Sequence, residues 1–409
     1  MDRLHRRNVS CRLGGTPKHL HKFLLIIALF SLLVACKEKE ITPECSDFTE
    51  GATLIVQDTI SISIPSTGFP TYTQLFLYKD SLLYCLKLGT EKLDIYNIFQ
   101  NAYVKSISLD PNFVQNLGAF FVHTTDSIFI TQELTYVLLI NDRGEIVDRY
   151  DLGHAPLSWT GSFDVPEYFF FAGSQAGLYY NSKRKDLVVT LTSPEIWYYE
   201  NRSSFGLHGT YNILTKTWKC VFGLLPGVYA RQNVAYPFIL SNPYCLSIGD
   251  TSYVSFPMDH NLYVYNNQSG DLLKVVCGAA RNFQIAEPFP YSELDDLERQ
   301  RNFLMTNGWY GALQYHRGVK LFSRTLVRNS QDVNNERETA VIFFNQNLKR
   351  IGEYVFRKSG PFQGVGGDGY SVGFPTASGF YGSLKSKFHK SDDELRYSIK
   401  FLIRKSHEN

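Results

Sequence analysis

Short, mainly apolar runs separated by polar breaks recur along most of the chain and predict a protein built from β-strands. The clearest group lies at Asp126–Tyr150, together with a run just before it, and most of its runs are rich in β-branched and aromatic residues. Short polar breaks between the runs are typical of turns. Four strands in up-and-down order predict one antiparallel sheet. We expect these strands at Gly118–Val122, Ser127–Thr131, Tyr136–Ile140 and Glu145–Tyr150.

Variants of this four-strand unit recur along the rest of the chain. Each unit has short runs of the same kind, and the units differ chiefly in the length of the segments between the runs. Repeated antiparallel units of this size are typical of the blades of a β-propeller. The units are predicted at residues 72–109, 118–150, 177–223, 244–277, 310–356 and 370–403.

The two ends of the chain carry complementary strand patterns. The last unit supplies three strands, and a spare strand, TISISI, stands before the first unit at Thr59–Ile64. If the spare strand pairs with the last unit, a circular array has no open edge. The sequence therefore predicts an all-β fold: a six-bladed β-propeller of four-stranded antiparallel blades, closed by the N-terminal strand pairing with the C-terminal blade.

Two other arrangements remain open. A seventh, degenerate sheet could lie at Phe163–Phe171, although Pro166 and the lack of a hairpin argue against it. Two stacked β-sandwiches would also contain many strands, but they would not predict the exchange between the chain ends.

One short loop helix is predicted between the fourth and fifth units, at Ser292–Leu304. Ser292 and Asp295 form a capping-box pattern, and leucines at 294, 297 and 304 fall on one helical flank.

The first 35 residues have the pattern of a signal peptide. A basic region precedes a twelve-residue stretch, Phe23–Val34, which is apolar except for Ser31 and is too short to span a bilayer. The sequence that ends at Cys36, Leu-Val-Ala-Cys, resembles the bacterial lipobox, in which the cysteine thiol receives a diacylglyceryl group; the alternative is an ordinary cysteine behind a secretory signal. We therefore expect a signal peptide at 1–35, a lipidated Cys36 with a polar tether at 36–56, and one propeller domain at 57–409.

The charge of the mature chain excludes one class of partner. Residues 1–35 hold six basic residues and one acid, so the formal net charge of +2 leaves about −3 for residues 36–409, which contain no basic run. A weakly acidic domain without a basic run offers no positively charged surface for nucleic acid. The five cysteines after Cys36 are an odd number without close pairs, and we interpret them mostly as small buried residues, above all Cys85, Cys220 and Cys245 in apolar strand patterns.

Long loops are predicted to gather on one face of the propeller. In an up-and-down blade, the loop between the second and third strands and the link to the next blade emerge on the same face, and long loops on a rigid scaffold are common binding sites. Aromatic side chains beside Arg and His would suit a sugar or a peptide, although core packing is the stronger interpretation for each one taken alone. The candidate ligand-binding residues are His154, Trp159, Trp197, Tyr198, Tyr229, Arg231 and Trp309.

Enzyme and cofactor patterns are sparse. The histidines after the signal have no metal-ligand spacing, and the glycine-rich run Gly360–Gly369 lacks the Lys-Ser/Thr of a phosphate loop, so we predict no cofactor, no metal and no assigned catalytic residue. Paired loop carboxylates could still support glycoside hydrolysis. The candidates are Asp164, Glu167, Glu195 and Glu287.

The lipobox, the charged tether and units whose second strands open at Asp80 and Asp126 with Asp-Ser-aliphatic sequences resemble an uncharacterised family of six-bladed propeller lipoproteins of Bacteroides-type bacteria. This resemblance implies a cell-envelope, outer-membrane lipoprotein, periplasmic or surface-facing, and brings no catalytic residues. We expect a membrane-anchored binding module for an envelope protein, peptide or glycan. The alternative is a propeller enzyme acting on polysaccharide, as a glycoside hydrolase or lyase.

Overall fold

The computed structural model describes residues 43, 45, 51–58, 62–63, 72–87, 92–110, 117–132, 136–152, 169–170, 177–192, 206–231, 233–328, 339–356, 374–382, 394–395 and 399–405. They all belong to one compact unit, Thr42–Asn409. The predicted signal peptide and Cys36 lie outside the described residues.

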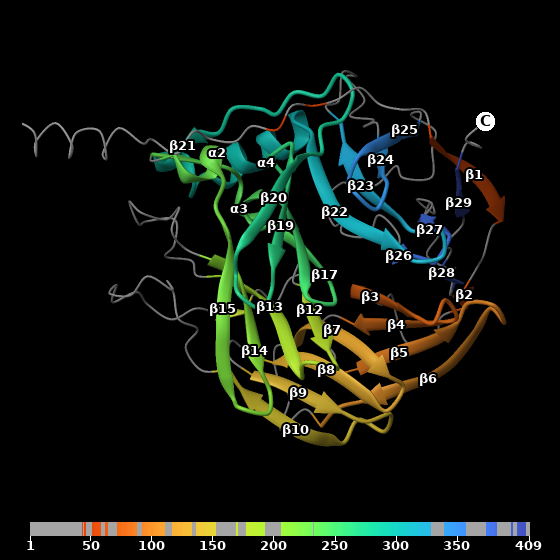
Figure 1. Ribbon diagram of the computed structural model, residues 1–409. Coiled ribbons are helices and arrows are strands. Elements are labelled where there is room, and N and C mark those ends of the chain that lie inside the picture. The colour runs from red at the N-terminus through yellow and green to blue at the C-terminus, as the bar shows by residue number, and fades with distance from the viewer. Residues whose placement is uncertain are drawn as a thin grey trace, which may run out of the picture. The chain divides into compact units, whose positions relative to one another are not determined.

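The described chain is an all-β propeller with four-stranded antiparallel blades (Figure 1). Five blades come from consecutive segments, and in each of them the strands pair in chain order. The first two blades are β3 (Tyr72–Tyr78), β4 (Leu82–Lys87), β5 (Lys92–Asn97) and β6 (Ala102–Ser108), then β7 (Leu117–Thr124), β8 (Ser127–Gln132), β9 (Tyr136–Ile140) and β10 (Ile146–Asp151). The third is β12 (Leu178–Asn181), β13 (Asp186–Thr192), β14 (Gly206–Asn212) and β15 (Thr217–Leu224). The fourth and fifth are β17 (Tyr244–Ile248), β18 (Thr251–Ser255), β19 (Asn261–Asn266) and β20 (Leu272–Cys277), then β22 (Trp309–His316), β23 (Leu321–Val327), β24 (Thr339–Phe344) and β25 (Arg350–Phe356).

These strands confirm five of the six units predicted from the sequence, within a few residues at each end. The alternative of a separate sheet at Phe163–Phe171 is not supported where that segment is described. Its residues Phe169–Phe170 form β11, which pairs with Leu191 and Thr192 of β13 and so extends the third blade.

A further small sheet joins the two ends of the chain. It consists of β1 (Ala52–Asp58) beside β29 (Ile399–Lys405), β27 (Gly379–Gly382) and β26 (Phe374–Pro375). The predicted closure therefore occurs, but the closing strand is β1 and not Thr59–Ile64. The part of that segment that is described, β2 (Ile62–Ser63), pairs instead with β28 (Glu394–Leu395).

Strand β1 closes the sheet because its residues fit against the fifth blade as well as against β29. Ala52 and Ile403 are buried in one cluster with Val341 and Phe343 of β24. The backbone N–H of Gly51 donates to the carbonyl oxygen of Ile351 at 2.6 Å. A side chain at Gly352 would collide with the carbonyl group of Ala52, so the close approach of β1 to β25 requires glycine there.

Contacts between first strands hold neighbouring blades together. Strand β7 contacts β3 and β12, and β22 contacts β17 and β26. The hydroxyl of Tyr179 on β12 donates to the carbonyl oxygen of Cys245 on β17 at 2.6 Å. Strand β26 in turn contacts β3, so these contacts run from the C-terminal sheet back to the first blade.

An asparagine recurs where the third strand of each of the five blades turns into the fourth. Its side-chain oxygen accepts hydrogen bonds from two backbone N–H groups further along the turn. Asparagine favours such turns because its short amide replaces a backbone acceptor. The five residues are Asn97, Asn141, Asn212, Asn266 and Asn345.

The helical segment lies where it was predicted but begins later. A 3₁₀ turn, η3 (Tyr291–Glu293), precedes helix α4 (Leu297–Thr306), and the helix is capped by Asp296, whose carboxylate accepts from the Arg299 N–H at 2.9 Å. The prediction that Ser292 caps the helix is therefore wrong. Ser292 and Asp296 both carry side-chain oxygens suited to capping, and the helix begins after the second of them. Two single-turn helices, α2 (Gly227–Ala230) and α3 (Phe238–Ser241), were not predicted. Among the described helices, none has the length and apolar content needed to cross a membrane.

Two of the cysteines form a disulfide bond, which corrects their interpretation as buried thiols. Cys45 is bonded to Cys277 at the end of β20, with a Cα–Cα distance of 5.3 Å and a sequence separation of 232 residues. Such a separation gives no local pattern in the sequence. Cys85, Cys220 and Cys245 are free and buried, as predicted.

Removal of the disulfide should destabilise the propeller. A cross-link across 232 residues lowers the entropy of the unfolded chain, so Cys277→Ser should reduce the free energy of unfolding by about 2–5 kcal/mol. Urea denaturation measures the change. Cys45→Ser should give the same loss, and a reductant should destabilise the native protein but neither variant. Equal stability of the native protein with and without reductant would contradict the prediction.

Candidate functional site

The loop-rich face of the propeller is described mainly beside the third, fourth and fifth blades. There the link 224–243 joins the third blade to the fourth, and the link 278–308 joins the fourth blade to the fifth. The turn 256–260 between β18 and β19 emerges on the same face. We call this side the loop face and the opposite side, which carries the tight hairpin turns, the turn face.

The two links fold together into one small substructure, which we call the loop-face cap and define as residues 224–231, 233–243 and 278–308. Strand β16 (Val234–Ala235) pairs with β21 (Phe289–Pro290), one strand from each link. The hydroxyl of Tyr236 donates to the carbonyl oxygen of Ala286 at 3.1 Å. In Figure 1, β21, α2, α3 and α4 gather at the end of the fourth blade.

Aromatic side chains form the interior of the cap. The rings of Tyr229 and Tyr236 lie 5.1 Å apart, and Phe303 of α4 packs against Tyr236 and Phe289 at 5.9 and 5.7 Å. Tyr229 also contacts Phe256, so the cap continues the core of the propeller. A substructure with its own core can hold surface residues in fixed positions.

Tyr229 serves this core and is only 2% exposed. Its hydroxyl donates to the carbonyl oxygen of Leu240 at 2.7 Å and accepts from the Met258 N–H at 2.8 Å. Burial raises the pKa of Tyr229 well above its ordinary value. The structure therefore places this candidate where an external ligand does not reach it.

Arg231 lies on the surface of the cap. Its guanidinium contacts the Glu287 carboxylate at 3.4 Å, and the two side chains are 59% and 86% exposed. An ion pair this exposed contributes little to stability, so both groups are accessible to a ligand. Of the four predicted carboxylates, Glu287 is the one described, and the enzyme alternative therefore stays a prediction.

Trp309 begins β22, the first strand of the fifth blade, and is partly buried against the same core cluster as Tyr229. The structure thus brings Tyr229, Arg231 and Trp309 to the region of the cap and its junction with the fifth blade. The other four candidates lie outside the described residues. They are His154, Trp159, Trp197 and Tyr198.

A buried arginine that was not predicted joins the fourth blade to the fifth under the loop face. Arg324 of β23 is fully buried, and its guanidinium donates to the carbonyl oxygens of Phe256, Asp259 and His260 at 2.8, 2.9 and 3.1 Å. The guanidinium also lies 3.8 Å from the ring centre of Tyr310. Burial lowers the pKa of Arg324 to about 10, so it remains charged at neutral pH. A charged residue inside the apolar strand LFSRTLV was the signal in the sequence.

His260 is held in the neutral form above this arginine. Its Nδ1 lies 2.7 Å from the Tyr310 hydroxyl, which itself accepts from the Ala280 N–H at 3.0 Å. One hydrogen bond therefore joins the imidazole ring to the Tyr310 hydroxyl. Burial, together with Arg324 and Arg350, lowers the pKa of His260 to about 4. With its pKa this low, the His260 ring is neutral at pH 7.

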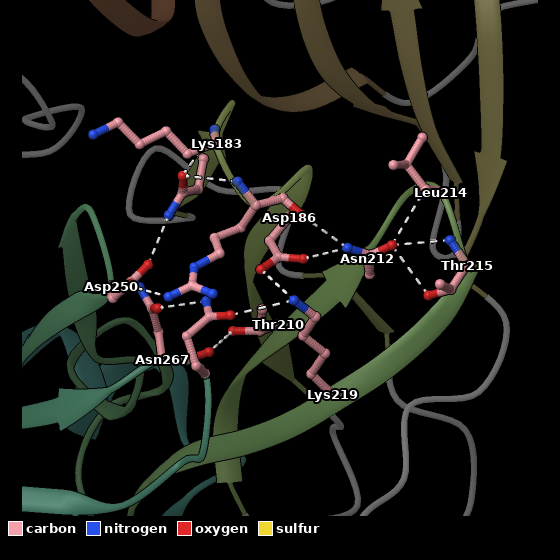
Figure 2. Close-up of polar contacts among 12 residues, drawn as sticks. Lys183, Asp186, Thr210, Asn212, Leu214, Thr215, Lys219, Asp250 and Asn267 are labelled. Atoms are coloured by element: carbon pink, nitrogen blue, oxygen red, sulfur yellow. Dashed lines mark hydrogen bonds and ion pairs between the residues drawn. The ribbon is translucent and has the colours of Figure 1, made fainter.

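The turn face carries a second polar cluster, between the third and fourth blades (Figure 2). The buried Asp186 carboxylate accepts from Lys219 and from Asn212, each at 2.7 Å. The neighbouring blade adds the ion pair between Arg184 and Asp250 at 2.9 Å, which lowers the pKa of Asp250. Because Asp186 is paired within the cluster, we interpret this network as a support for the turns.

His208 is one of the described residues whose buried side chain has polar atoms without a hydrogen-bond partner. His208 of β14 is fully buried beside Phe222, and neither ring nitrogen has a hydrogen-bond partner among the described residues. Burial lowers the pKa of His208 to about 3. Within the described ranges, no group of three or more His, Cys, Asp or Glu side chains could hold a metal ion.

Comparisons with known proteins agree on the fold. No protein-family model and no curated protein matches the sequence. A solved structure of a DUF4221 family member from Bacteroides vulgatus superimposes with a TM-score of 0.63 over 88% of this chain and 100% of that one, at 15% identity. A Bacteroides fragilis protein named for its expected export gives a TM-score of 0.52 over 89% and 98% of the two chains, at 12% identity. At these identities the likeness concerns the fold.

Acid should destabilise the protein through His208. The unfolded chain binds a proton there below its ordinary pKa of 6.5, whereas the folded protein resists protonation down to about pH 3. The contribution of the neutral histidine to the free energy of unfolding is therefore complete above pH 6.5 and is lost as the pH falls towards 3. His208→Leu should change stability little at pH 7.5 and raise it by about 3 kcal/mol relative to the native protein at pH 4. Urea denaturation at both pH values checks this, and the same difference at both would contradict it.

The two roles of the turn asparagines should separate by mutation. Asn212→Ala removes both the turn hydrogen bonds and a partner of the buried Asp186, and should cost about 2–3 kcal/mol. Asn97→Ala removes turn hydrogen bonds alone and should cost about 1 kcal/mol. The free energies of unfolding of the two variants measure the difference. Equal losses would mean that the Asp186 contact adds no stability.

Proposed function

We propose that the protein is a cell-envelope lipoprotein, anchored through a diacylglyceryl group on Cys36, whose loop face binds an envelope protein, a peptide or a glycan. The observation that carries the proposal is the loop-face cap. Two links from different blades have joined into a substructure with its own aromatic core, and the cap presents Arg231 and Glu287 at its surface. A connection that served only to join two blades would need no such substructure.

The location is supported by chemistry independent of the lipobox. A structural disulfide forms and persists in oxidising compartments such as the bacterial periplasm or the cell surface. The Cys45–Cys277 bond meets this description. The structurally similar Bacteroides fragilis protein, which is named for its expected export, is consistent with the same location for this chain.

We further propose that the sheet of β1, β26, β27 and β29 is a sixth blade. Its order places β26 first and β1 last, as a blade with one strand exchanged between the chain ends requires. Strand β26 contacts the first strands on both sides, β22 and β3, and this supports a ring of six.

The anchor and the binding face are tested separately. Metabolic labelling with a radioactive fatty acid should mark the native protein but not Cys36→Ser, and a native protein without label would contradict lipidation.

Binding is tested with a glycan array and with cross-linking in isolated envelopes. Arg231→Glu should lower the affinity for the ligand so found by about tenfold or more, since it reverses a charge on the cap. Lys183→Glu on the turn face is the matched control and should leave the affinity unchanged. If a folded protein captures nothing, or both variants lose affinity equally, the loop face is not the binding surface.

A further inference from the structure

The disulfide bond fixes the place where the N-terminal segment leaves the propeller. Cys277 is the last residue of β20, pairs with Asn261, and stands at the loop-face end of the strand. Strand β20 is the fourth and outermost strand of its blade. Cys45 is therefore held at the outer edge of the fourth blade, and the chain that precedes it starts from there.

The length of the segment before Cys45 limits how far the fourth blade can lie from a membrane. Nine residues lead from Cys36 to Cys45. Fully extended, they span about 30 Å at most. Without the disulfide, the tether would run free as far as Gly51, where the backbone is bonded to Ile351, and could span about 50 Å. The bond thus brings one edge of the propeller close to the lipid attached at Cys36, and this step rests on the anchoring proposed above.

The same edge presents apolar side chains. Leu272 and Leu273 begin β20 and are 49% and 56% exposed, and the exposed Lys274 follows them. Leu273 lies four residues from Cys277, about 13 Å along the strand. An exposed leucine pair next to a lysine suits the boundary of a bilayer, because the leucines enter the interface while the ammonium group stays among the head groups.

We propose that the outer edge of the fourth blade, formed by β20, lies on the membrane, with Leu272 and Leu273 in the lipid interface and the Cys45–Cys277 bond holding that edge in place. The propeller then stands on its edge, which leaves the loop face open sideways to a ligand. The occupant is a lipid surface, and its source is the bilayer that carries the anchor of the same chain.

The second blade offers a matched control. Ile146 and Val147 begin β10, its outermost strand, and are 41% and 60% exposed, so they resemble the leucine pair in place and exposure. No disulfide bond joins that strand to the tether, because both cysteines of the bond lie elsewhere.

The test uses full-length lipidated protein on phosphatidylethanolamine and phosphatidylglycerol vesicles that contain brominated acyl chains. Leu273→Cys and Val147→Cys are each labelled with an environment-sensitive fluorophore; the free native cysteines that the structure describes are buried and do not compete. Bromine should quench the label at position 273 at least threefold more than the label at 147. In a Cys45→Ser/Cys277→Ser background this difference should fall to less than half.

Each outcome decides the orientation. Equal quenching at the two positions, or stronger quenching at 147, would overturn the proposal. A difference that persists without the disulfide would show that the leucines act alone and would overturn the role of the bond. If the fatty-acid label shows that Cys36 is not lipidated, its thiol is coupled to a maleimide phospholipid and the same comparison is made, so a failed anchor and a wrong orientation are told apart.

Discussion

The pairing of β1 with β29 is the interaction on which the rest of the fold depends. Beside the seven-residue β29, the C-terminal segment supplies only short strands to its sheet, with two residues in β26 and four in β27. Strand β1 adds seven residues beside β29 and covers part of the fifth blade through Ala52. Without it, β29 would become the edge of a three-stranded sheet, and the cluster around Val341 and Phe343 would lose one side. The disulfide bond acts on the same segment, because it holds the chain just before β1 against the fourth blade.

Polar groups between blades are arranged differently on the two faces of the propeller. On the turn face, Asp186 and its partners lie inside a closed network that leaves no carboxylate of that group unpaired. On the loop face, Arg324 fixes the turn 256–260 by donating to three carbonyl oxygens. That turn holds His260, and the cap that follows places Arg231 and Glu287 in solvent. The Asp186 network holds the hairpin turns together, whereas Arg324 holds a turn beneath the exposed surface of the loop face.

The repeat could be predicted from the sequence because each blade is built from local signals. Strands such as Ser127–Gln132 are rich in β-branched and aromatic residues, and an asparagine marks the turn after the third strand in each of the five blades. What was missed depends on contacts distant in sequence. Nothing local distinguishes Ala52–Asp58 from Thr59–Ile64 as the closing strand, since the choice depends on packing against the fifth blade. Two further contacts form only when the blades pack together. They are the disulfide bond between Cys45 and Cys277 and the hydrogen bonds from Arg324 to its three carbonyl partners.

The central claim is that the N-terminal strand is an integral part of the propeller. Hydrogen exchange of the native protein tests it most directly, because backbone amides exchange only when their hydrogen bonds open. The account predicts that peptides covering Ala52–Asp58 and Ile399–Lys405 are protected to a similar degree as β24 in the centre of the fifth blade. Exchange of Ala52–Asp58 at the rate of an unfolded chain, while β24 stays protected, would contradict the closed ring.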